Sequence, residues 1–253
     1  MHSSKVEIDY YYIVAAAGIG KRMGLTYPKQ FLEVDGKPIF IMTLEVIEKN
    51  HRVTGIIVVT NEEYIYEVEK MCRTFRITKV IDVVSGGFER QDSIYNALQQ
   101  IPKDSIIGVQ DGVRPFIEDR YIEDSYVKLM KETNLDGIVV GVPIKDTIKI
   151  VDLDGKIVET PKRDLLFAAQ TPQVFRGEIL HRSYEIAKKQ KFLGTDDSSL
   201  VEKTGGCVET ILGSYENIKI TTPEDLLIFS KERINKITTK KNKENFLCLN
   251  NKN

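Results

Sequence analysis

Strand-like and helix-like patterns alternate through the first 144 residues, and this alternation constrains the fold more than any other feature. Short apolar runs rich in β-branched residues occupy 11–17, 54–60, 79–87, 105–112 and 137–144. The segments between them, 39–50, 62–75, 90–101 and 119–133, carry apolar residues at helical spacing. This order predicts an α/β, Rossmann-like fold with a mostly parallel sheet and helices on both faces. Ligands of such sheets bind at the carboxyl ends of the strands.

The pattern changes after Ile144. Polar and apolar residues alternate there around Asp154-Gly155, a favoured hairpin turn, which predicts an inserted β-hairpin arm at about 142–170. Beyond the arm we expect a turn and helix at 170–189, an N-capped helix at 194–205, a short strand at 217–221 and a helix at 222–234. Residues 1–235 should form a single domain, and the tail at 236–253, rich in Lys and Asn, should be disordered.

Composition excludes several classes of function. The net charge of −1 gives no overall attraction to nucleic acid or to a membrane surface. No apolar run reaches the length of a membrane span, and the amino-terminal segment lacks the apolar core of a signal peptide. Three cysteines without metal-type spacing indicate a reduced, cytoplasmic setting. None of the three histidines lies in a cluster suited to metal binding or to a catalytic triad.

A glycine turn with three cations follows the first strand, in the segment 15–30. A dinucleotide-binding fingerprint would need glycine where Met23 stands, and a P-loop would need Ser or Thr where Arg22 stands, so neither motif is present. What remains is a glycine turn carrying Lys21, Arg22 and Lys29. Backbone N–H groups and cations at a strand end favour a site for several phosphates.

The whole chain then resembles a known family. Gly-x-Gly-x-Arg-Met followed by Pro-Lys-Gln is similar to the sugar-nucleotidyltransferase fold, and "GGFERQDSIYNAL", "QDGVRPFI", "KDTIK", "QTPQVFR", "GTDDSSLVE" and "GSYENIKITTPEDL" resemble the 2-C-methyl-D-erythritol 4-phosphate cytidylyltransferases. The resemblance covers about residues 11 to 232. It implies transfer of CMP from CTP to 2-C-methyl-D-erythritol 4-phosphate, with release of pyrophosphate, in non-mevalonate isoprenoid biosynthesis. Two alternatives stay open: a cytidylyltransferase for another polyol phosphate such as ribitol 5-phosphate, and a nucleotide-binding regulatory protein without turnover.

The resemblance also implies roles for individual residues in binding and activating CTP. It implies that Arg22, Lys29 and Lys219 stabilise charge on the α-phosphate and on the leaving pyrophosphate. It implies that the cytosine edge is recognised near Gly87 and by the Ser93 hydroxyl. The residues implied for nucleotide binding are Ala16, Ala17, Gly18, Gly87, Ser93 and Gly112. Lys219 is expected on the short strand at 217–221.

The second substrate and a metal ion complete the expected site. The residues implied for the polyol phosphate are Asp111, Arg114, Thr147, Arg163, Thr171 and Thr195, although helix capping explains Thr195 equally well. Asp111, at a strand end, is the expected Mg²⁺ ligand. The family usually has His-Asp-Ala where this chain has Gln110-Asp111-Gly112, so the chain departs from the family pattern on both sides of Asp111. The arm is expected to cross a homodimer and to bring Thr147 and Arg163 to the partner's substrate.

Overall fold

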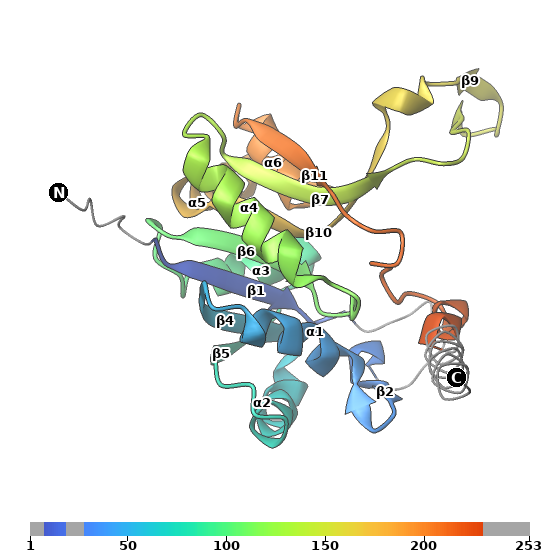
Figure 1. The fold of residues 1–253 in the computed structure, drawn as a ribbon. Helices are drawn as coiled ribbons and strands as arrows, with labels where there is room; N and C mark the ends of the chain where they lie inside the picture. Colours follow the sequence, from blue (N-terminus) through green and yellow to red (C-terminus); the bar gives the residue numbers. More distant parts are fainter. Residues whose placement is uncertain (1–7, 19–27, 230–253) are drawn as a thin grey trace, which may run out of the picture.

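A seven-stranded sheet forms the centre of the protein, in the order β11-β7-β10-β6-β1-β4-β5 (Figure 1). The computed structural model describes residues 8–18 and 28–229. The strands of this sheet are β1 Tyr10–Ala15, β4 Val53–Thr60, β5 Val80–Ser85, β6 Ile106–Asp111, β7 Gly137–Pro143, β10 Phe167–Arg176 and β11 Val208–Leu212. Buried β-branched residues dominate β4 and β6, whereas β1 buries two tyrosines together with Ile13 and Val14.

Six strands of the sheet are parallel, and β10 is the exception. It pairs antiparallel with both of its neighbours, β6 and β7. The mostly parallel sheet predicted from the sequence is therefore confirmed, but the turn expected at the start of 170–189 is wrong, because these residues complete β10. The strand β11 was not predicted.

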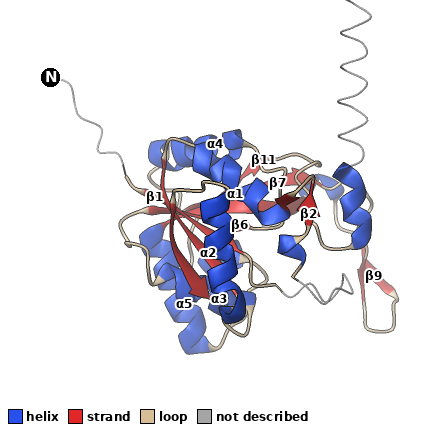
Figure 2. Ribbon diagram, turned by 90° about the horizontal axis from the view of Figure 1, so that it is seen from below, coloured by secondary structure: helices blue, strands red, loops and turns tan. Residues whose placement is uncertain are grey.

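Helices cover both faces of the sheet (Figure 2). The helices α1 Ile39–Lys49, α2 Ile65–Thr74 and α4 Asp119–Lys131 pack in one apolar core together with Tyr12 and Val14 of β1. The helices α3 Arg90–Leu98, α5 Gly177–Gln190 and α6 Asp197–Lys203 pack in a second core with Ile13 of the same strand. Alternate residues of β1 thus serve opposite faces, as the two-residue period of a strand requires.

The hairpin arm occupies residues 144–166, between β7 and β10, and extends away from the sheet (Figure 1). Its two short strands, β8 Ile150–Val151 and β9 Ile157–Glu159, pair antiparallel, and Gly155 takes the positive φ of the turn. The exposed apolar side chains of the arm are Ile148, Ile150, Val151, Leu153, Ile157, Val158 and Leu165. Such a row of exposed apolar residues is typical of a surface that binds another protein.

The remaining segments are short. A small hairpin, β2 Glu33–Val34 and β3 Lys37–Pro38, precedes α1, and single 3₁₀ turns lie at Lys29–Phe31, Glu62–Tyr64, Arg163–Leu165 and Pro223–Leu226. Residues 217–221 form no strand, so that prediction is wrong, whereas Pro223 begins a helical turn as expected. The predicted tail at 236–253 lies outside the described residues.

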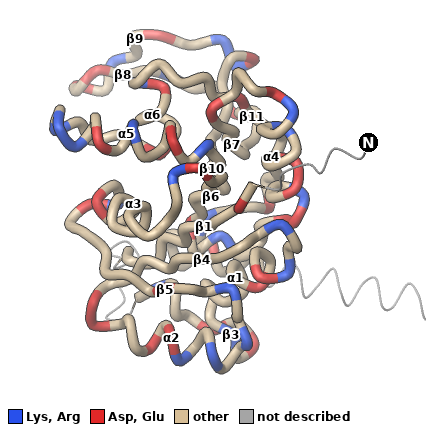
Figure 3. Tube along the Cα trace, turned by 90° about the vertical axis from the view of Figure 1, so that its left-hand side faces the viewer, with Lys and Arg blue, Asp and Glu red and all other residues tan. Residues whose placement is uncertain are grey.

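Basic and acidic positions are interspersed along the chain in the view of Figure 3, in keeping with the net charge of −1. In the described part of the chain, no helix has the length and apolar character needed to cross a membrane.

Candidate active site

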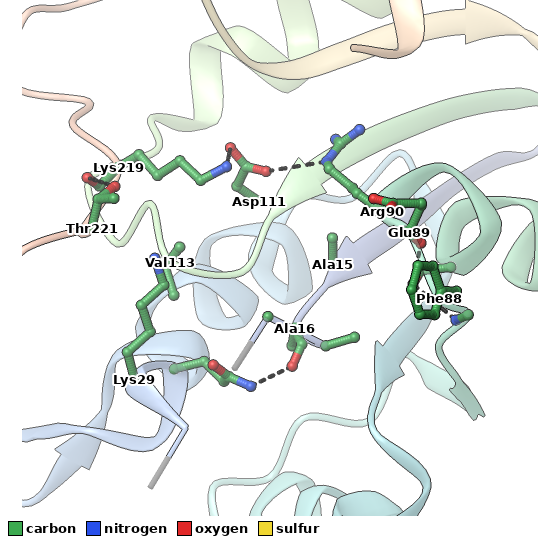
Figure 4. A pocket seen from close by; sticks show the side chains of 15 residues that line it. Ala15, Ala16, Lys29, Phe88, Glu89, Arg90, Asp111, Val113, Lys219 and Thr221 are labelled. Carbon is green, nitrogen blue, oxygen red and sulfur yellow. Dashed lines mark hydrogen bonds and ion pairs between the residues drawn. The ribbon is translucent and has the colours of Figure 1, made fainter. Parts of the chain in front are cut away.

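A cavity of about 640 Å³ opens at the carboxyl ends of β1, β5 and β6 (Figure 4). Its walls come from the segment after β1, the turn before α3, the end of β6 and the segment after β11. The lining residues are Ala15, Ala16, Ala17, Gly18, Lys29, Gln30, Gly87, Phe88, Glu89, Arg90, Ser93, Asp111, Val113, Lys219 and Thr221. The cavity lies where ligands bind in α/β sheets of this kind.

Three cations converge on the carboxylate of Asp111, which is only 5 % exposed. Lys219 Nζ and Arg114 Nε each lie 3.1 Å from Asp111 Oδ2, and Arg90 Nε lies 3.8 Å from Oδ1. Burial alone would raise the pKa of this carboxyl group, but the three positive charges outweigh burial and hold the pKa well below its usual range. The cluster therefore carries a net positive charge at neutral pH and suits an anionic ligand.

Arg90 was not predicted as a site residue. Its guanidinium lies 2.8 Å from Asp197 Oδ2, and the fully buried Asp197 also accepts a hydrogen bond from the Tyr184 hydroxyl. Burial would lower the pKa of Arg90, but the carboxylates of Asp197 and Asp111 outweigh it and raise this pKa. A signal for Arg90 did exist in the sequence. An arginine in the first turn of a helix opposes the helix dipole, so such a residue calls for an acidic partner or an anionic ligand.

The loop after β1 supplies another wall of the cavity. Lys29 is 8 % exposed, and its ammonium group donates a hydrogen bond of 2.8 Å to the carbonyl of Ile220. The Gln30 amide donates to the carbonyl of Ala16, which ties the two ends of this loop together. Arg22 lies outside the described residues. The structure thus brings Gly18 and Lys29 of the predicted loop to the cavity, while the predicted contact of Arg22 stays a prediction.

The turn before α3 forms another end of the cavity, lined by Gly87, Glu89 and Ser93, and its one charged side chain, Glu89, is acidic. The Ser93 hydroxyl accepts a hydrogen bond from the Gly87 N–H and donates one to the Glu89 carbonyl, each at 3.0 Å. A Cβ atom on Gly86 would come within 2.9 Å of the Ala17 Cβ and 3.0 Å of Ser93 Oγ, so only glycine fits there. This end can hold a flat ring against backbone groups and one hydroxyl.

Other predicted site residues lie outside the main cavity. Gly112 donates its N–H to the Ala15 carbonyl, and Thr171 lies beneath Asp111, where its hydroxyl accepts the Asp111 N–H at 3.1 Å. Thr195 lines an adjoining cavity of about 210 Å³, together with Arg90.

The two predicted residues of the arm lie farther away. Thr147 and Arg163 are exposed there and do not line either of these two cavities, and the Arg163 guanidinium donates to the carbonyl of Lys145. Lys219 reaches Asp111 from an irregular segment instead of from a strand.

Comparisons with known proteins agree on one family. The model of the 2-C-methyl-D-erythritol 4-phosphate cytidylyltransferase family matches residues 10–231. The chain belongs to this family. A member from Fusobacterium nucleatum is 45% identical over 229 residues, covering 89% of this chain and 98% of that protein, and one from Clostridioides difficile is 46% identical over 221 residues, covering 87% and 91%.

Solved structures of cytidylyltransferases share the fold as well. The 4-diphosphocytidyl-2C-methyl-D-erythritol synthase from Anaerococcus prevotii has a TM-score of 0.77 at 29% identity, over 90% of this chain and 97% of that one. The enzyme from Francisella tularensis has a TM-score of 0.72 at 29% identity, over 86% and 96%. The predicted family, the α/β fold and the nucleotidyltransferase class are thus confirmed. The comparisons support this family over the ribitol 5-phosphate and non-catalytic alternatives.

Proposed function

We propose that this cytidylyltransferase transfers CMP from CTP to 2-C-methyl-D-erythritol 4-phosphate in the cavity at the ends of β1, β5 and β6. The observation that carries the proposal is the group of three cations around Asp111, in the same cavity as a turn that offers glycine backbone and one hydroxyl. The phosphates of a nucleoside triphosphate suit the cations, and its flat base suits the turn.

The reaction is a displacement at phosphorus. An oxygen of the substrate phosphate forms a bond to the α-phosphorus of CTP, and the bond from that phosphorus to the oxygen bridging to the β-phosphate breaks, which releases pyrophosphate. The attacking phosphate is already an anion at neutral pH, so no general base is required. The barrier is the repulsion between two anions, and cations that neutralise charge lower it.

Different cations of the site neutralise charge on different phosphates. Lys29 and Lys219 face the triphosphate and stabilise charge on the α-phosphate and on the leaving group, together with Arg22 of the opening loop. Arg90 adds a guanidinium that Asp197 holds in place. Arg114, 11 % exposed at its side chain and bonded to the Asn217 carbonyl at 2.8 Å, faces the phosphate of the second substrate.

The single carboxylate of the cluster fits a magnesium ion that is shared with the nucleotide. The described residues contain no group of three or more His, Cys, Asp or Glu that could enclose a metal ion. Mg²⁺ commonly binds through one or two carboxylates plus substrate phosphates, and Asp111 is buried, ionised and placed at the charged end. When bound, Mg²⁺ would neutralise phosphate charge. Asp111 also holds Lys219 and Arg114 in place without it.

The base is bound at the turn before α3, against Ala16, Ala17, Gly18 and Gly87. The single hydrogen of the Ser93 hydroxyl is donated to Glu89, so this oxygen offers only an acceptor to a ligand. Cytosine presents an amine at its 4-position, whereas uracil presents a carbonyl there. Ser93 can therefore accept from cytosine and cannot donate to uracil.

The second substrate lies near Arg114, Thr171 and Thr195, and the arm of a partner subunit completes its site. The exposed apolar residues of the arm support an exchange across a homodimer, in which Thr147 and Arg163 reach the partner's cavity.

Release of pyrophosphate tests this function. The purified protein is given CTP and Mg²⁺ with 2-C-methyl-D-erythritol 4-phosphate, with ribitol 5-phosphate, or with no second substrate. We expect pyrophosphate only with the first compound, and Arg114→Ala should greatly raise its KM. Turnover only with ribitol 5-phosphate would overturn the substrate, and no turnover with either compound would support a regulatory protein.

A further inference from the structure

The distribution of charge in the cavity fixes how CTP is oriented, if the proposed function holds. Lys29 and Lys219 lie on the opposite side of the view from Phe88 (Figure 4), and the one charged side chain of the turn before α3, Glu89, has the same sign as a phosphate. A triphosphate is far more stable beside cations than beside a carboxylate. The pyrimidine ring therefore occupies the end at the turn before α3.

Phe88 lies on that turn and lines the cavity, yet its side chain is 95 % exposed. Figure 4 shows its ring on the opposite side of the view from Lys219. Among the phenylalanines of the described residues, Phe88 alone is exposed. A ring at the mouth of a ligand cavity, with so little of its surface covered, is placed to cover a ligand.

The backbone on both sides of Phe88 is anchored. The N–H of Gly87 donates to Ser93 Oγ and the N–H of Glu89 donates to Asp92 Oδ2, each at 3.0 Å. These bonds belong to the start of α3, so the helix fixes the position of the turn. The ring can rotate about its side-chain bonds, but its Cα cannot move away from the cavity without breaking the helix cap.

We propose that the Phe88 ring stacks on the pyrimidine ring of bound CTP and closes the cavity at the turn before α3. Stacking on an aromatic side chain strengthens binding of any base, because every base has a π-face. Phe88 thus contributes affinity for the nucleotide, and the distinction between cytosine and uracil is left to Ser93 and the neighbouring backbone. Phosphate binding at the other end does not depend on the ring.

The first test compares affinities for three ligands by isothermal titration calorimetry. Phe88→Ala should raise the Kd for CTP about tenfold, raise that for UTP by the same factor, and leave that for pyrophosphate unchanged. Phe88→Tyr keeps the aromatic ring and should bind CTP as wild type does. Tyr66→Ala removes another exposed ring, 72 % exposed on α2 and outside the cavity, and should change none of the three.

The second test detects stacking directly. The chain contains no tryptophan, so Phe88→Trp introduces a single tryptophan, at this site. We expect CTP to quench its fluorescence and pyrophosphate to leave it unchanged. Tyr66→Trp serves as the control, and neither ligand should affect it.

The outcomes separate this inference from the proposed function. If wild type binds no CTP, the proposed function fails and the inference fails with it. If wild type binds CTP, and Phe88→Ala binds it equally tightly or loses CTP and pyrophosphate together, the inference alone is wrong. Absence of quenching by CTP in a Phe88→Trp protein that still binds CTP would also contradict it.

Discussion

Asp111 is the residue on which the charges of the site depend, because its two oxygens face Lys219, Arg114 and Arg90. Sequence reasoning located Asp111 and Arg114 from their place at a strand end. It missed Arg90, whose partner Asp197 is 107 residues away in the chain. A contact between such distant residues leaves no trace in local periodicity.

Loss of the Asp111 charge should destabilise the protein in a way that depends on pH. The pKa of Asp111 is lower in the folded state than in the unfolded state, so its stabilising effect is present above the unfolded value, about 4, and declines as the pH falls below it. We expect Asp111→Asn to lower the free energy of unfolding between pH 5 and 8 by a constant amount. Below about pH 4, the difference from wild type should shrink.

Urea denaturation of both proteins across this pH range measures the effect. A matched control is Asp154→Asn, at the exposed turn of the arm, which should show no such trend. A difference between wild type and Asp111→Asn that grows as the pH falls would contradict the sign of this linkage.

The choice of base should depend on the hydroxyl of Ser93. Wild type should favour CTP over UTP by about 10- to 100-fold in kcat/KM, since uracil would leave a carbonyl facing an acceptor. Ser93→Ala removes the acceptor and should reduce this ratio to a few-fold, mainly through slower turnover of CTP. Steady-state kinetics of wild type and Ser93→Ala with both nucleotides measures this ratio. An unchanged ratio in Ser93→Ala would show that other residues distinguish cytosine from uracil.

At the scale of elements, the start of α3 is joined to α6 and α5 by Arg90, Asp197 and Tyr184. This connection holds a helix end against the cavity, and it orients the Arg90 guanidinium toward Asp111. Its members come from segments that the sequence predicted correctly as helices. The connection itself depends on packing of three helices on one face of the sheet.

Weakening this connection should slow the reaction through Arg90. We expect Asp197→Asn to lower kcat about tenfold, because the guanidinium loses the charged partner that fixes its direction. Arg90→Ala should lower kcat at least as much. The double variant should be little worse than Arg90→Ala alone, since both changes remove the same contribution.

Steady-state kinetics of the two single variants and the double variant form a complete cycle. Tyr184→Phe, which keeps the carboxylate of Asp197, should retain most of the activity. Effects of Asp197→Asn and Arg90→Ala that simply multiply would mean that Asp197 acts independently of Arg90.

The strand β10 shows where sequence patterns fail at this scale. Its residues Gln170, Thr171 and Gln173 are almost fully buried. Because they are polar, the sequence has no apolar run that would predict a central strand here. Gln170 bonds to the Ser214 carbonyl, and Gln173 bonds to Asp196 and to the Ser198 N–H. These side chains support the loops around the site. Their polarity led to the prediction of a turn. The hydrogen bonds that explain this polarity join residues far apart in the chain, so the sequence alone could not show them.

At the scale of the whole molecule, the arm is the feature that the sequence predicted best. Alternation around Asp154-Gly155 indicated a hairpin, and the structure has one between β7 and β10. The orientation of the arm, away from the cavity of its own chain, could not be read from the sequence, because it depends on how the sheet ends there.

If the arm exchanges across a homodimer, two inactive variants should complement each other. Lys29→Ala removes a cation from the cavity and Arg163→Ala removes one from the arm, and each alone should lower kcat by about 100-fold or more. In a mixed dimer one site carries both changes and the other carries neither. Random mixing of equal amounts gives half mixed dimers, so about a quarter of wild-type activity should return.

The measurement is activity after the two variants are unfolded and refolded together. Wild type taken through the same treatment is the control for recovery. No gain over the separate variants, with full recovery of wild type, would show that Arg163 acts within its own chain or not at all.

The reversed direction of β10 has a consequence for how this protein can change over time. Because β10 runs opposite to β7, the arm leaves and returns at adjacent positions, with Phe167 paired to Pro143 and the Ile144 N–H bonded to the Leu166 carbonyl. Any stretch of chain with neighbouring ends could replace it without disturbing the register of the sheet. The insert is therefore a module: descendants of this gene can lengthen, shorten or reshape it, and so alter how copies associate, while the nucleotide pocket is inherited intact.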